Sequence, residues 1–128
     1  MNAALRLALP FAALLVAYDA LTALVAKALT ISYNSFLVPA LVIIFFMGVY
    51  AGRVTRSWAG IFPVALAACV DATLGWYVAA LIGPGFVPGW TMRQLVAMGL
   101  ESAALSTAVG CAGIWIGLRV ARLRRGVS

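Results

Sequence analysis

The sequence contains no histidine and only three acidic residues among its 128. The missing histidine removes the commonest metal ligand and the usual acid–base group near neutral pH. The two cysteines, Cys69 and Cys111, lie within apolar runs and are too few for a disulfide framework. A glycine-rich phosphate loop and a nucleophile motif are also missing. We therefore expect a protein that is not an enzyme and that uses no cofactor and no metal ion.

Charge is scarce along the whole chain, because 9% of the residues are charged and 66% are hydrophobic. A soluble domain would carry far more charge. Crossing a hydrocarbon core of roughly 30 Å takes about 20 residues of helix, and the sequence has four continuous apolar runs of about that length. We expect an all-α polytopic membrane protein, with residues 1–128 forming a single four-helix transmembrane domain. Its helices, in two hairpins, are predicted at about 5–28, 36–52, 59–82 and 92–120.

The basic residues are distributed unevenly between the two predicted membrane surfaces. Lys27 and Arg93 lie on one side, and seven arginines lie on the side that holds both termini. Basic loops stay in the cytoplasm, so we expect both termini to be cytoplasmic in a multi-pass protein of a prokaryotic inner or plasma membrane. Arginines near the surface also contact anionic lipid, whereas nucleic-acid binding has no support beyond the short basic tail. The seven arginines are Arg6, Arg53, Arg56, Arg119, Arg122, Arg124 and Arg125.

All three acidic residues, Asp19, Asp71 and Glu101, fall inside predicted membrane helices. A carboxyl is costly at the bilayer centre and usually faces other helices or a wet cavity. Small residues share the helical stripe of each acid, and small stripes allow helices to approach closely. We therefore expect the acids to face other helices, to converge on one polar centre that binds a proton, cation or solute, and at least one to be protonated at neutral pH. The hydroxyls that complete this candidate site are those of Thr22, Thr73 and Ser102.

Two patterns occur twice in the chain. A proline lies about two turns before an Asp-Ala pair at both Asp19 and Asp71. A Gly-x-aromatic-x-Gly pattern followed by arginine occurs at Gly48–Gly52 and again at Gly113–Gly117. The two hairpins are hypothesised to be parallel copies related by an axis along the membrane normal; the alternative is chance similarity between helices of similar composition. The default role of these glycines is helix packing or dimerisation.

Two classes of function fit these features. The first is a proton- or cation-coupled transporter of a small solute, which would act as a homo-oligomer because four short helices cannot enclose a sizeable pathway alone. Its plan is similar to that of small multidrug transporters in architecture, although none of that family's extended motifs is present. The alternative is an accessory or assembly subunit of a membrane complex. Its acids would only form hydrogen bonds between helices in the lipid bilayer.

Overall fold

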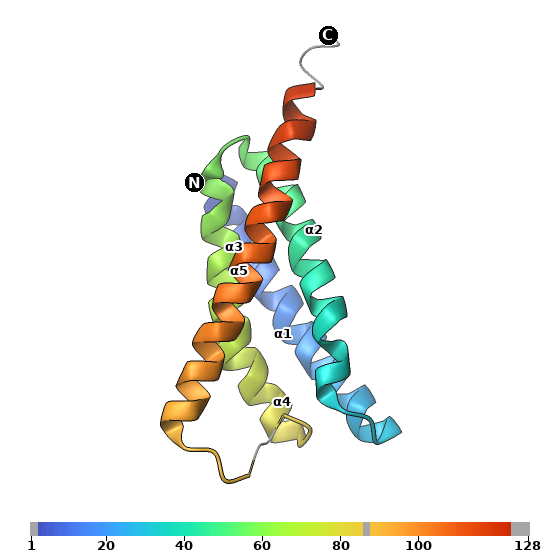
Figure 1. Cartoon of the computed structure of the whole chain (residues 1–128). Coiled ribbons are helices and arrows are strands. Elements are labelled where there is room, and N and C mark those ends of the chain that lie inside the picture. Colours follow the sequence, from blue (N-terminus) through green and yellow to red (C-terminus); the bar gives the residue numbers. More distant parts are fainter. Residues whose placement is uncertain (1–2, 86–87, 124–128) are drawn as a thin grey trace.

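The computed structural model describes residues 3–85 and 88–123, and every regular element within these ranges is helical (Figure 1). Four helical segments are long and apolar enough to cross a membrane. The predicted all-α fold of a four-helix membrane protein is therefore confirmed. The four segments are Ala3–Leu29, Tyr33–Thr55, Trp58–Ile82 and Met92–Leu123.

Two of the four segments are single helices and two are composite. The first is α1 (Ala3–Leu29) and the fourth is α5 (Met92–Leu123). The second consists of a 3-10 turn, η1 (Tyr33–Phe36), that leads directly into α2 (Leu37–Thr55). The third contains a 3-10 turn, two α-helices and a π-helical turn between them. Its parts are η2 (Trp58–Gly60), α3 (Ile61–Val70), the π turn η3 (Asp71–Gly75) and α4 (Trp76–Ile82).

The helices begin and end at local capping structures, and the chain reverses direction between them. Arg56 ends α2 in a left-handed conformation, with its N–H donating to the carbonyl of Gly52 over 3.0 Å. Gly83 ends α4 at φ 127°, a conformation that costs a glycine little. Thr91 and Gln94 form a reciprocal capping box at the start of α5, with bonds of 2.8 Å and 3.3 Å. The helix boundaries are thus set locally.

The bundle has two distinct ends. The start of α1, the end of α5 and the turn between α2 and η2 lie at one end, here called the terminal end (Figure 1). The turn from α1 to η1 and the connection from α4 to α5 lie at the opposite end, here called the loop end. Side chains of the apolar core come mainly from the half of each helix nearer the terminal end. They are Phe11, Leu15, Ile44, Met47, Ala51, Val64, Ala67, Ile114 and Leu118.

Helices α2 and α5 make the most extensive contact in the bundle, and glycines allow it. A methyl group added at Gly48 would meet the backbone of Gly110, and one added at Gly113 would meet the backbone of Phe45. Side chains at these points would force the helices apart, so the two backbones touch as in small-residue membrane interfaces. Towards the loop end the same two helices diverge (Figure 1).

The glycine contacts are reciprocal. Gly48 meets the residue three positions before Gly113, and Gly113 meets the residue three positions before Gly48. In the same way, Gly52 meets Ile114 and Gly117 meets Val49, each of which directly follows the first glycine of the other motif. Reciprocal pairs of this kind are the signature of a two-fold interface. This packing supports the hypothesis of two parallel copies, as does the packing of α1 against α3.

Candidate functional site

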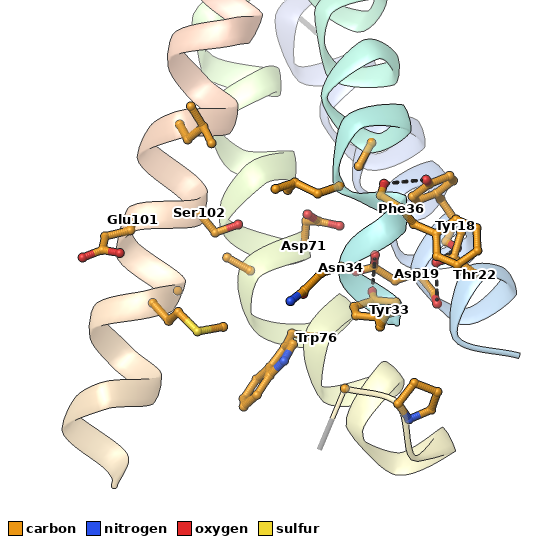
Figure 2. A pocket seen from close by; sticks show the side chains of 18 of the residues that line it. Tyr18, Asp19, Thr22, Tyr33, Asn34, Phe36, Asp71, Trp76, Glu101 and Ser102 are labelled. Carbon is orange, nitrogen blue, oxygen red and sulfur yellow. Dashed lines mark hydrogen bonds between the residues drawn. The ribbon is translucent and has the colours of Figure 1, made fainter. Parts of the chain in front are cut away.

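A cavity of about 530 Å³ lies between the loop-end parts of α1, α2, α4 and α5 (Figure 2). Its volume is in the range of small-molecule sites, which is roughly 300–1,000 Å³. Aromatic and aliphatic side chains form most of its wall, and a few polar groups interrupt them. The polar groups include Asp19, Thr22, Asn34, Asp71 and Ser102.

Asp19 and Asp71 bring their carboxyl groups together in this cavity. Asp19, in the middle of α1, is only 8% exposed, whereas Asp71 is half-buried at the start of η3. The two side chains are close enough to interact directly. A methyl group at Gly75 would overlap an Asp19 carboxyl oxygen and would lie 3.2 Å from Asp71 Oδ1. Gly75 therefore leaves the space in which the two carboxyls meet.

The π turn η3 sets the position of Asp71. A π turn inserts one extra residue into a helical turn, and such turns occur frequently at functional sites. Here the turn begins at Asp71 and ends at Gly75, so the two residues that shape the carboxyl pair lie at its two ends. The insertion changes the helical phase between α3 and α4. As a result, Asp71 and Trp76 both line the cavity.

Two tyrosines connect η1 to α1 at the edge of the site. The Tyr33 hydroxyl donates a hydrogen bond of 2.7 Å to Asp19 Oδ1. The Tyr18 hydroxyl donates one of 2.8 Å to the carbonyl of Phe36. The hydroxyl of Thr22, beside them, donates a hydrogen bond of 2.9 Å to the backbone carbonyl of Tyr18. Asp19 is thus held by a neutral donor from a turn at the loop end.

No basic side chain neutralises the carboxyl pair within the described residues. Lys27, the nearest candidate along α1, instead donates a hydrogen bond of 2.9 Å to the carbonyl of Ile82. Two like charges in contact in apolar surroundings repel strongly. A cation or a proton can compensate the negative charge of the pair.

The third predicted acid does not join the pair. Glu101 is exposed, lies at the rim of the cavity and points away from Asp71 (Figure 2). The next residue, Ser102, points into the cavity instead, because successive residues of a helix are turned by about 100°. Thr73 is also exposed, and its hydroxyl donates a hydrogen bond of 2.8 Å to the carbonyl of Cys69. Of the three acids that were expected to converge, Asp19 and Asp71 do so and Glu101 does not. Thr22 and Ser102 lie beside the pair.

The remaining predicted residues lie in the terminal half. Gly48, Gly52, Gly113 and Gly117 all lie in the α2–α5 contact. The described arginines near the terminal end are exposed, and Arg119 stacks on Trp115 with 3.9 Å from its guanidinium carbon to the ring centroid. These are Arg6, Arg53, Arg56, Arg119 and Arg122, whereas Arg124 and Arg125 lie outside the described residues.

Several site residues were not predicted from the sequence. Tyr33 was not among the predicted site residues, yet its hydroxyl donates a hydrogen bond to Asp19. Gly75 was not among them either, yet its missing side chain makes room for the Asp19 carboxyl. Two features of the sequence could have suggested these residues. Tyr33 lies in a polar turn that follows a helix with an acid, and Gly75 comes one turn after an acid.

The fold and the site define a four-helix integral membrane protein with an acidic cavity whose wall is mostly aromatic and aliphatic. Compared with protein-family models, curated proteins and solved structures, the chain has no match in any of the three.

Proposed function

We propose that the protein is a small membrane transporter that binds a cation at the Asp19–Asp71 pair in exchange for a proton. The observation that carries this proposal is the meeting of two carboxyls inside a cavity, with no basic partner among the described residues. Ionisable groups within a membrane are costly, and they mark ion and substrate pathways. A purely structural acid pair would not need an adjoining space of about 530 Å³.

In this proposal a cation and a proton compete for the same negative charge, so the binding of one favours the release of the other. A cation bound at the pair stabilises the ionised form, so its binding releases a proton. By linkage, a rise in pH removes the competing proton and strengthens cation binding. An imposed proton gradient can then drive cation movement in the opposite direction.

The basic residues suggest the orientation of this exchange. The terminal end carries most of the arginines, so we place it in the cytoplasm of a prokaryotic inner or plasma membrane. The cavity at the loop end then faces the outside. A complete pathway needs more than four helices, and we propose that copies of the chain associate to form it.

Proton release on cation binding tests the proposed function. The purified protein, in detergent and weak buffer with a pH indicator, is titrated separately with sodium chloride and benzyltrimethylammonium chloride. We expect at least one cation to acidify the solution saturably, and Asp71→Asn to abolish that signal. Glu101→Gln is the matched control, because it makes the same change at an exposed carboxyl. A thermal melt of each variant establishes that it is folded.

Transport is tested in proteoliposomes with an acidic interior. The cation that acidifies the detergent solution should cause proton efflux when added outside. If neither cation releases protons, or if Asp71→Asn folds and releases them as the wild type does, the proposed function is wrong.

The second candidate function, an accessory subunit, is favoured by the outward face of α5. Glu101 shares this exposed face with Ala97, Ala104 and Ala108. A carboxyl on a small-residue face of a membrane helix suits contact with another helix. Under this alternative, Ala104→Leu and Glu101→Gln would dissociate a complex isolated from native membranes, while Asp71→Asn would leave it intact.

A further inference from the structure

The cavity combines two kinds of surface that suit different parts of one molecule. The carboxyl of Asp71 lies nearer the terminal end, and Trp76 lies nearer the loop end (Figure 2). The rings of Tyr18, Phe36 and Trp90 also line the cavity. Aromatic faces attract cations through their quadrupole, and more strongly when water is excluded. The cavity therefore offers a carboxyl to a charged group and rings to an apolar body.

The size of the cavity argues against a bare inorganic ion as its occupant. A hard metal ion needs several oxygen ligands at close range. Within residues 3–85 and 88–123, no group of three or more His, Cys, Asp or Glu could hold a metal ion. Besides the two aspartates, only a few side chains of the lining carry oxygen, among them Thr22, Asn34 and Ser102, and most of the wall is apolar. A molecule that fills about 530 Å³ and uses this wall is organic.

We propose that the substrate is a monovalent organic cation with an apolar body, such as an arylalkylammonium ion; this inference rests on the transport function proposed above. Its ammonium group lies against Asp71, and its body lies against Trp76 and Phe36. A single ammonium group forms one ion pair, and the Asp71 carboxyl at the cavity wall supplies its partner. Asp71 is the acceptor because Tyr33 already donates to Asp19, whereas no described hydroxyl donates to Asp71.

The surroundings of the cavity suit entry from the membrane. Leu37 and Ala40 of α2 line one side, and Leu95, Met98 and Leu105 of α5 line the other. These helices diverge towards the loop end (Figure 1). An amphiphilic cation that partitions into the bilayer would meet mostly apolar side chains between them, with Glu101 at the rim.

Three probes at equal concentrations test the substrate class: benzyltrimethylammonium chloride, sodium chloride and sodium benzoate. A quaternary ammonium ion has no acidic proton on nitrogen, so any proton that it releases comes from the protein. We expect benzyltrimethylammonium to bind in calorimetry and to release protons, and the two sodium salts to do neither. Trp76→Leu should weaken its binding roughly 2- to 30-fold, the range of a desolvated cation–π contact. Trp115→Leu, at the opposite end of the bundle, is the matched control.

Each alternative result overturns a different step. If sodium releases protons through Asp71 and the organic cation does not, the substrate class is wrong and the proposed function stands. If neither cation releases protons, both proposals fail. If benzoate binds as tightly as the cation, or if Trp115→Leu weakens binding as much as Trp76→Leu, the cavity does not recognise an organic cation in this way.

Discussion

The terminal half and the loop half of the bundle are built from the same helices in opposite ways. In the terminal half, α2 and α5 touch backbone to backbone, and the apolar core fills the space around them. In the loop half the two helices separate around a cavity that contains two carboxyls. One half therefore supplies the packing that allows the other half to remain open.

Glycine has a different role in each half. Gly48 and Gly113 remove side chains so that two backbones can meet. Gly75 removes a side chain so that the Asp19 carboxyl has space. Both roles depend on a missing methyl group, but the first fixes the structure and the second creates room for a polar group. Substituting each glycine with alanine should separate stability from binding.

The largest effect on stability is expected from Gly113→Ala. The added methyl group would overlap the backbone of Phe45, which cannot move without shifting α2. Overpacking of this kind costs about 1–3 kcal/mol or more, which exceeds the gain of about 1 kcal/mol in helix propensity. The free energy of unfolding, measured by denaturation in mixed micelles, should fall accordingly.

The matched control lies on the same helix. A methyl group at Gly99 would have its nearest neighbour, the carbonyl oxygen of Ala72, at 3.5 Å, an ordinary contact. Gly99→Ala should therefore leave the free energy of unfolding unchanged or raise it slightly. Equal losses in Gly113→Ala and Gly99→Ala would show that the two halves do not differ in packing as described.

The reciprocity of the glycine contacts gives a second stability prediction. Gly48 occupies the position in its motif that Gly113 occupies in the other, and each meets a backbone oxygen of the facing helix. Gly48→Ala should thus lower the free energy of unfolding by about as much as Gly113→Ala, within roughly 0.5 kcal/mol. The same unfolding assay checks it. A cost confined to one of the two glycines would contradict the two-fold relation.

The sequence predicted the framework of both halves better than the details of the site. The spans were expected at 5–28, 36–52, 59–82 and 92–120, and each lies within a few residues of a helical segment in the structure. Hydropathy and basic residues suffice for that, because the bilayer fixes the length of each helix. The similar surroundings of Asp19 and Asp71 also suggested that the two occupy equivalent positions in the two hairpins.

The π turn and helical phase account for what the sequence did not reveal. No sequence pattern in Asp71–Gly75 predicts the extra residue of the π turn. Because that residue changes the helical phase, the directions of the α4 side chains could not be derived from the sequence. Glu101 was placed on a stripe of small residues, but that stripe is exposed in the single chain. A stripe of small residues indicates close packing without stating which helix provides it. The hydrogen bond from Tyr33 depends on how the turn folds back, which periodicity does not describe.

The largest effect on binding with little effect on packing is expected from Gly75→Ala. Its methyl group would displace the Asp19 carboxyl and disturb the pair, so binding of benzyltrimethylammonium should weaken at least about 10-fold, equivalent to about 1.4 kcal/mol. The displaced group is the end of a side chain, so the loss of stability should be smaller than in Gly113→Ala. Calorimetry and the unfolding assay measure the two effects on the same preparations. A Gly75→Ala protein that binds normally would show that the carboxyl pair does not form the site.

The smallest effect is expected from Tyr33→Phe, which keeps the ring and removes the hydrogen bond to Asp19. If Tyr33 competes with the cation for the negative charge of the pair, its removal should strengthen binding several-fold, by up to about 10-fold, since a hydrogen bond to a charged group contributes about 1.5 kcal/mol or more. The loss of this tether should also speed amide exchange in η1. Tyr77→Phe, on the exposed face of α4, is the control and should change neither quantity. Weaker binding in Tyr33→Phe would mean that the hydroxyl belongs to the binding site rather than competing with its ligand.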